Sequence, residues 1–141
     1  RALDIARSEN MEEEEAVLLN NIGSLYYKTK NYDKAMAMYA DAISINERCK
    51  SHERLFVNYN NMSSVHVKRN NLDKGLEYAY LALHQLDSVG NADMSRLMLR
   101  NIASIYSMKG MKRHAIAMLR SILDYQEQNR RTAYLGALSC R

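Results

Sequence analysis

The sequence repeats itself with a fixed period, the interval from Asn20 to Asn60 and from Asn60 to Arg100, and this regularity constrains the fold more than any other feature. Residues 20–26 (NNIGSLY) align with residues 60–66 (NNMSSVH) and with residues 100–106 (RNIASIY). A second stretch keeps the same register, with Ala35, Gly75 and Ala115 at matching positions. In a chain of like units, each unit packs mainly on its neighbours. The repeat therefore predicts an open-ended stack.

Each unit is predicted to contain two helices. In the first unit the apolar positions recur at helical spacing on both sides of a polar break: Leu19, Ile22, Gly23 and Tyr26, then Ala35, Tyr39 and Ala42. The chain of 141 residues has no proline and five glycines, which leaves few turn residues for a β fold. We expect an all-α fold, an α-solenoid of antiparallel helix pairs.

The polar breaks have the residues that end one helix and begin the next. Lys30, Asn70 and Gly110 occupy the position at which a helix ends in a left-handed residue. Asn31 and Asn71 follow as candidate N-caps of the second helix. Small residues recur where two helices must approach closely, namely Gly23, Ser63, Ala103, Ala35, Gly75 and Ala115.

This pattern resembles the tetratricopeptide repeat (TPR), whose signature has Leu-Gly and Tyr at the spacing of Ile22-Gly23 and Tyr26, then Ala and an aromatic at the spacing of Ala35 and Tyr39. The longer period of 40 is similar to the repeats of kinesin light chains, spindle-orientation adaptors and bacterial regulators. The resemblance implies a TPR superhelix whose concave groove, lined by the first helices, binds a protein or peptide. It also implies a sensor or interaction segment of a larger bacterial signalling or transcription regulator.

The repeat register divides the chain into three full units, residues 16–55, 56–95 and 96–135. Residues 1–15 are predicted to end a preceding repeat, with Arg1 to Ser8 in its second helix. Residues 136–141 are predicted to start a further repeat, because Gly136 lies one period beyond Arg96. We therefore expect residues 1–141 to form one section of a longer solenoid.

Polar residues recur on the first helices at positions where packing does not require them. The resemblance assigns these positions to the peptide-binding groove: Asn20, Asn21, Ser24, Lys28, Asn60, Asn61, Ser64, Lys68, Arg100, Asn101 and Ser104. An asparagine amide both donates and accepts, which suits the backbone of a peptide. The alternative is that these side chains bond the neighbouring helix and set the stacking angle. Val17, Val57 and Leu97 are expected to add apolar contacts at one edge.

Charge is unevenly distributed along the chain. Residues 1–47 carry five basic and nine acidic side chains, whereas residues 96–141 carry nine basic and two acidic ones. A basic C-terminal third that contacts nucleic acid is one alternative function, although we expect nucleic acid to be an unlikely partner of this segment. Self-association of a spacer module through exposed solenoid ends is another. No apolar run approaches the roughly 18 residues of a membrane span, so no membrane contact is expected.

The sequence favours a non-catalytic protein without cofactors. No histidine lies four residues from another histidine or a cysteine, the spacing of metal ligands on a helix, and no phosphate loop or nucleophile motif is present. His66 is predicted to pack in the core, and Glu12 to Glu15 to precede a helix start and favour its dipole. Cys49 and Cys140, more than two repeat units apart, are expected to be free thiols, which favours the cytoplasm and leaves an extracytoplasmic sensor segment open.

Overall fold

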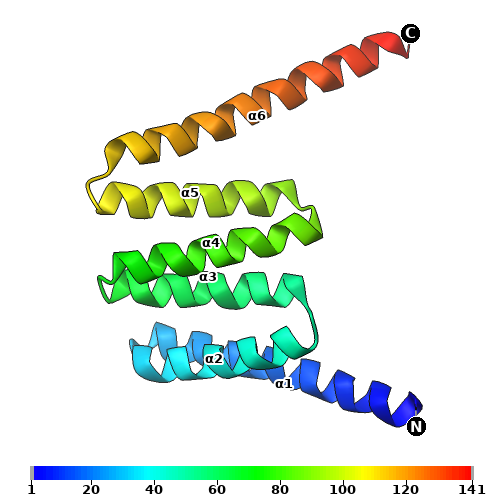
Figure 1. Ribbon diagram of the computed structural model, residues 1–141, viewed down its shortest axis with the longest axis vertical. Helices are drawn as coiled ribbons and strands as arrows, with labels where there is room; N and C mark the ends of the chain where they lie inside the picture. The colour runs from blue at the N-terminus through cyan, green and yellow to red at the C-terminus, as the bar shows by residue number, and fades with distance from the viewer. Residues whose placement is uncertain (1, 141) are drawn as a thin grey trace.

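The computed structural model describes residues 2–140, which form six helices and no strand (Figure 1). The helices are α1 (Ala2–Lys28), α2 (Tyr32–Arg48), α3 (His52–Lys68), α4 (Leu72–Val89), α5 (Ala92–Met108) and α6 (Lys112–Ser139). Successive helices run in opposite directions, and each packs on the next along the chain. The predicted all-α solenoid of antiparallel helix pairs is confirmed.

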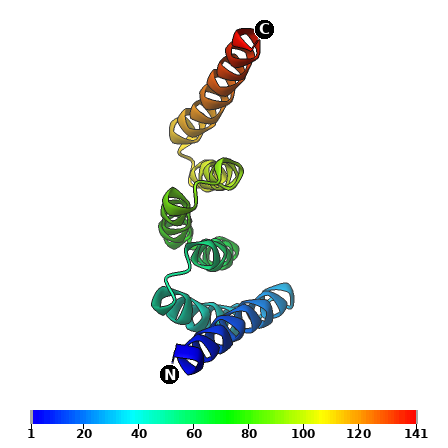
Figure 2. The ribbon, with the colours of Figure 1, turned by 90° about the vertical axis from the view of Figure 1, so that its right-hand side faces the viewer.

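The helices repeat with the period of the sequence. The second helices start at Tyr32, Leu72 and Lys112, and α3 and α5 start at His52 and Ala92, so each kind of helix recurs after one repeat period. Figure 2 shows α1, α3 and α5 along one side of the stack and α2, α4 and the start of α6 along the other. The first helices therefore share one face. The unit boundaries at 16–55, 56–95 and 96–135 remain a prediction.

Left-handed residues end the helices, as predicted. Lys30, Asn70 and Gly110 have φ angles of 62°, 60° and 78°. Two further left-handed residues, Lys50 at 54° and Gly90 at 71°, occupy equivalent places in the connections between pairs, where no prediction was made. The connections within pairs and between pairs therefore each contain one left-handed residue, which ends the preceding helix in a short turn.

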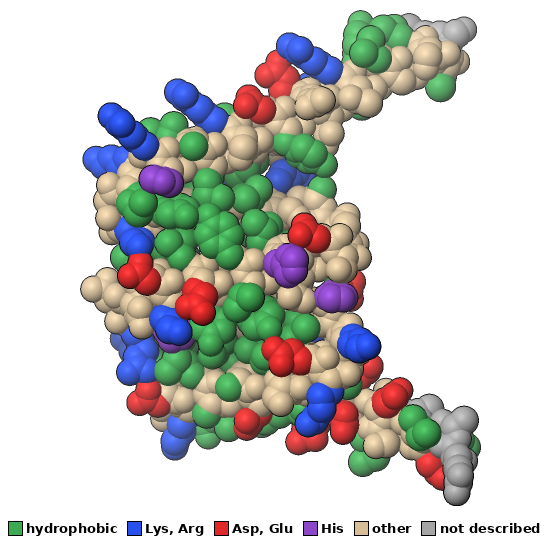
Figure 3. Space-filling model, viewed as in Figure 1, with side chains coloured by type: hydrophobic (Ala, Val, Ile, Leu, Met, Phe, Trp, Pro, Cys, Tyr) green, Lys and Arg blue, Asp and Glu red, His purple; other side chains and the backbone are tan. Residues whose placement is uncertain are grey.

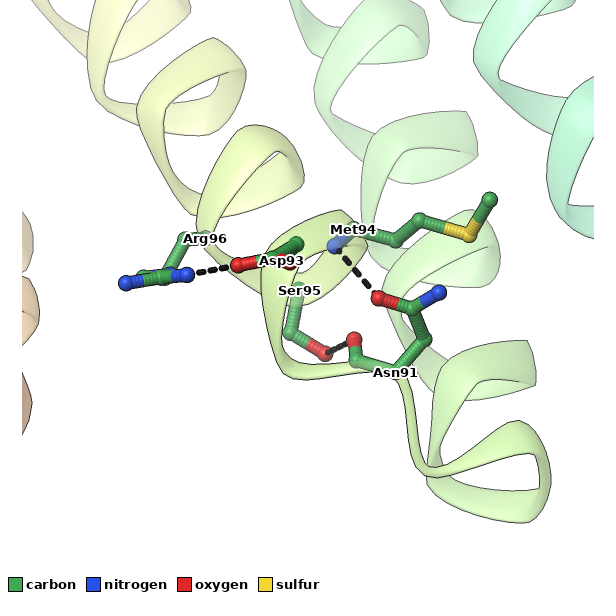
Figure 4. A network of polar contacts seen from close by, with 5 residues as sticks. All are labelled: Asn91, Asp93, Met94, Ser95 and Arg96. Carbon is green, nitrogen blue, oxygen red and sulfur yellow. Dashed lines mark hydrogen bonds and ion pairs between the residues drawn. The ribbon is translucent and has the colours of Figure 1, made fainter. Parts of the chain in front are cut away.

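The predicted N-caps form in part. Asn71 caps α4 by accepting a hydrogen bond from the backbone N–H of Lys74 at 3.4 Å, whereas Asn31 precedes α2 without a side-chain cap bond. Asn91 caps α5, because its Oδ1 accepts from the backbone N–H of Met94 at 3.1 Å (Figure 4). In the same turn Ser95 Oγ donates to the Asn91 carbonyl, and Arg96 pairs with Asp93.

Small residues allow the close helix approaches that the sequence predicts. A Cβ atom added at Gly23 would lie 2.7 Å from Cε1 of Tyr39, so the buried Tyr39 ring occupies the space above this glycine. In the next pair, Ser63 Oγ donates to the carbonyl of Gly75 at 2.7 Å. A larger side chain at these positions would separate the two helices of a pair.

The terminal helices are longer than expected. α1 has 27 residues and α6 has 28, against 17 or 18 for the helices between them. Residues 2–15 extend α1 and are not separated from it by a turn, so the expected second helix of a preceding repeat is absent from this stretch. Residues 136–139 likewise continue α6. Arg1 and Arg141, which the prediction also covered, lie outside the described residues.

The interpretation of Glu12 to Glu15 as residues before a helix start is wrong. They lie in the middle of α1, because this stretch is rich in strong helix formers and contains no turn residue that would break it. Glu13 instead pairs with Arg54 of α3 at 3.0 Å, and Glu12 lies 3.9 Å from Arg48 of α2. These carboxylates therefore link α1 to the next two helices.

Candidate functional site

Asparagine side chains link the first helices of neighbouring units. Asn61 Nδ2 donates to Asn20 Oδ1 at 2.9 Å, and one unit further Asn101 Nδ2 donates to Asn60 Oδ1 at 3.5 Å. The same hydrogen bond thus recurs between α1 and α3 and between α3 and α5. The structural role that the sequence left open is therefore present, because these amides connect adjacent units.

A buried extension of this network was not predicted. Asn58 Nδ2 donates to Asn20 Oδ1 at 3.0 Å, and Asn58 Oδ1 accepts from Asn46 Nδ2 at 2.7 Å. Asn46 and Asn58 are fully buried, and Oδ1 of Asn46 has no hydrogen-bond partner within the structure. Leaving a buried amide oxygen without a donor costs about 1–3 kcal/mol. The network therefore retains an unused acceptor.

This acceptor belongs to a residue that lines a pocket between the first two units. The pocket has a volume of about 350 Å³ and is lined by Ala16, Val17, Asn20, Asn46, Glu53, Arg54, Val57, Asn58 and Met94. Val17 and Val57 are the apolar residues that the sequence placed at one edge of the groove, whereas Leu97, the third, does not line the pocket. Apolar walls and amide groups together can hold an apolar side chain and a hydrogen-bonding backbone.

The other predicted groove residues are divided among several environments. Ser24 and Ser64 each donate to the carbonyl four residues earlier, Asn20 and Asn60 respectively, at 3.1 Å. Lys28 and Lys68, at the last residues of α1 and α3, and Asn21 are exposed. Arg100 and Ser104 line a separate hollow that includes α6 residues. The structure thus joins Asn20 to Asn61 and Asn60 to Asn101, but it does not unite all eleven residues.

Burial and nearby charges shift the pKa values of aromatic and thiol groups around the stack. Burial and the hydrogen bond that Tyr59 donates to Glu47 raise the pKa of Tyr59 to about 12. The pKa of His66 is lowered, first by burial and then by Lys74 and Arg69, and its ring stacks on Tyr78 at 5.3 Å. His66 is therefore half-buried against Tyr78 and not enclosed in the core as predicted, in a setting that favours the neutral ring.

Within residues 2–140 no group of His, Cys, Asp and Glu side chains has the arrangement of a metal site. None of the helices described is long and apolar enough to span a membrane. Cys49 and Cys140 are free thiols, as predicted, and burial together with Glu12 raises the pKa of Cys49. We therefore take the pocket between the first two units as the candidate site.

Comparisons with known proteins agree with this architecture. A family model described as tetratricopeptide repeat matches residues 16–49. The structure is similar to the TPR domain of Arabidopsis FLU, with a TM-score of 0.74 and 12% identity over 83% of this chain and 98% of that one. The N-terminal domain of C. elegans stress-induced protein-1 aligns with a TM-score of 0.69 and 15% identity, over 80% and 85% of the two chains.

A third solved structure, BtubC from P. vanneervenii, aligns with a TM-score of 0.74 and 18% identity. That alignment covers 92% of this chain and 54% of BtubC. No curated protein matches the sequence. At these identities the solved structures establish the fold, and the family model identifies a repeat in the first helix pair. Residues 16–49 are therefore a tetratricopeptide repeat, and the described chain has the fold of TPR domains.

Proposed function

We propose that this chain is a non-catalytic scaffold that binds a peptide segment of a partner protein on the face formed by α1, α3 and α5. The TPR fold is in general that of a protein-interaction scaffold. The observation that carries the more specific proposal is the pocket of about 350 Å³ in which Val17 and Val57 adjoin the amides of Asn20, Asn46 and Asn58.

The chemistry of this pocket indicates what enters it. Val17, Val57 and Met94 favour an apolar side chain, because burying apolar surface yields about 25 cal/mol per Å². The amides of Asn20, Asn46 and Asn58, which line the pocket, offer hydrogen-bonding groups to a ligand. The ligand is therefore a segment that presents an apolar side chain next to hydrogen-bonding groups, as a peptide backbone does.

The wider setting follows from the resemblance of the repeat period. We place the chain as the interaction segment of a larger bacterial signalling or transcription regulator, because a period of 40 is similar to that of such regulators. In that setting the groove would sense a peptide or protein, and the free cysteines support a cytoplasmic location.

Replacing Val57 with aspartate tests the pocket. Val57 is partly exposed, so the variant is expected to fold, but its carboxylate would lose water where it faces the apolar part of the ligand. Peptides selected on the wild-type chain from a random-peptide display library should bind this variant at least about tenfold more weakly, or ~1.4 kcal/mol, in calorimetry.

The matched control is Leu81→Asp, because Leu81 is similarly exposed on α4 and does not line the pocket. Its affinity for the same peptides should equal that of the wild-type chain. Equal binding by the Val57 variant, or a loss caused only by the Leu81 variant, would remove the pocket from the proposal.

Nucleic-acid binding by α6 remains an alternative proposal. Lys112, Arg113 and Arg120 are exposed, while Arg131 is already paired with Glu127 at 3.2 Å. Nucleic-acid binding would make the affinity for a labelled DNA duplex fall steeply as salt rises, because each phosphate contact releases counterions. We expect only weak binding in a fluorescence-anisotropy titration. Tight, steeply salt-dependent binding would favour the alternative.

A further inference from the structure

An apolar stripe on α1 is uncovered at the start of the stack. Leu18, Ile22 and Leu25 lie on one face of this helix, and Leu18 and Leu25 are 61% and 63% exposed. In the next two units the residues at the position of Leu18 are Asn58 and Met98, with 2% and 0% exposure. The stripe is therefore not covered by any helix within residues 2–140.

The internal units show what covers such a stripe. Met98, Ile102 and Ile105 of α5 form one apolar cluster with side chains of the preceding second helix, among them Leu76, Ala79, Leu83 and Leu86 of α4. By the repeat register, Leu18, Ile22 and Leu25 correspond to Met98, Ile102 and Ile105. The α1 stripe thus has the pattern of a surface that receives a second helix.

The opposite end of the stack presents the matching surface. Ile116, Leu119 and Leu123 of α6 correspond to Leu76, Ala79 and Leu83 of α4, and all three are exposed. Beside them a hollow of about 500 Å³ is lined in part by Ala103, Ala115, Ile116 and Leu119. In the first unit the positions of Ala115 and Leu119 are those of Ala35 and Tyr39, which are buried in one cluster with Met62 and Val65 of the following helix.

We propose that the two ends bind each other between copies, so that α6 of one chain packs antiparallel on α1 of the next. Ile22 and Leu25 of the second copy would fill the hollow beside Ile116 and Leu119, as Met62 and Val65 fill its counterpart in the first unit. Leu123 would then contact Leu18 of the second copy. This contact has the same arrangement as the packing of α4 on α5 within the chain. It does not depend on peptide binding in the groove.

Charge favours a second copy as the occupant. α1 carries six Asp or Glu and two Lys or Arg, whereas α6 carries five Lys or Arg and two Asp or Glu. Figure 3 shows Lys and Arg side chains projecting from α6 at the top, and Asp and Glu side chains frequent over α1 and α2 at the bottom. Opposite net charge on two facing surfaces favours their association.

The extensions of α1 and α6 beyond the inner helices also lie on one side (Figure 1). α1 and α6, with 27 and 28 residues, both extend beyond the inner helices, and Figure 1 shows the two extensions on the same side of the stack. In an antiparallel pair the extension of α6 would lie along that of α1. Exposed apolar side chains on both extensions would then contact each other: Leu3 and Ile5 on α1, and Tyr134, Leu135 and Leu138 on α6.

Light scattering after size-exclusion chromatography tests the proposal. Such a head-to-tail contact does not close on itself by a two-fold axis, so it adds copies until a ring closes or a filament grows. The average mass of the wild-type chain should therefore rise above 16.3 kDa as its concentration rises. Leu18→Asp and Leu123→Asp should each hold the mass at 16.3 kDa, whereas Leu81→Asp, away from both ends, should behave as wild type.

Mixing the two end variants gives the sharper result. The Leu18 variant keeps an intact α6 and the Leu123 variant keeps an intact α1, so the mixture should form a one-to-one pair of twice 16.3 kDa and grow no further. A wild-type chain that stays at its monomer mass at every concentration would overturn the proposal and leave the end faces to another occupant. A mixture that remains monomeric, or a single variant that still assembles, would also overturn it.

Discussion

Replacing Tyr39 with alanine is expected to lower the free energy of unfolding by about 3–5 kcal/mol, the cost of truncating a large buried aromatic ring. Tyr39 is almost completely buried, and its ring lies over Gly23. It shares a cluster with Met62 and Val65 of α3, so it contacts both its own helix pair and the next one. Chemical denaturation monitored by circular dichroism measures this loss.

Tyr39→Phe is the matched control, because it keeps the ring and removes only the hydroxyl that lies 3.2 Å from Ser24 Oγ. That variant should lose about 0.5–1.5 kcal/mol, the usual net value of one hydrogen bond. If the alanine variant lost no more than the phenylalanine variant, the ring would not be the main contact between the first two units. Hydrogen exchange should also accelerate in α1 and α2 before α4 and α5, because units of a solenoid are stabilised by their neighbours.

The size of the small residue that faces position 39 changes with the size of the side chain at that position, as a comparison of equivalent residues in the repeats shows. The facing residues are Gly23 and Tyr39 in the first unit and Ala103 and Leu119 in the third. A glycine therefore accompanies the largest ring, and an alanine accompanies the leucine. The sequence could predict that these positions are small and close to another helix. It could not predict which large side chain fills the space, because that depends on the three-dimensional contact.

The helix pairs and their breaks were predictable because local signals repeat. Lys30, Asn70 and Gly110 each follow a helical apolar pattern at the same offset, and all three adopt the left-handed conformation. The continuity of α1 was not predictable from the register, since residues 12–15 align with the start of α3 but carry no residue that ends a helix. In that stretch local helix propensity outweighs the repeat pattern.

The candidate site was predictable only for those of its residues that repeat from unit to unit. Asn20, Asn60, Asn61 and Asn101 repeat, so their shared helix face was visible in the sequence. Asn58 does not repeat, because Leu18 and Met98 occupy its position in the other units, and averaging over repeats assigns it to the apolar core. A polar residue in an otherwise apolar position was the signal for the buried network. Arg100 lies apart from these asparagines, in a hollow that residues of α5 and α6 line.

Replacing Asn58 with alanine is expected to destabilise the chain by about 1–3 kcal/mol, because Asn46 would lose the acceptor for its Nδ2 at 2.7 Å. Asn46 is buried and its Oδ1 already has no partner, so its whole amide would become unsatisfied. The next interface contains Leu86 and Met98 at the corresponding positions. The double variant Asn46→Leu with Asn58→Met therefore copies an apolar pair that this fold already accommodates.

The double variant is expected to be as stable as the wild-type chain or more so, although each single change is destabilising. Replacing both partners of a buried polar pair removes the desolvation cost, whereas replacing one partner leaves it. The same variant should bind groove-selected peptides more weakly, because it lacks two of the amides that line the pocket. Higher stability with weaker binding would show that the unpaired amide is retained for recognition. A double variant that loses as much stability as the two single changes together would show instead that the amide network holds the first two units in place.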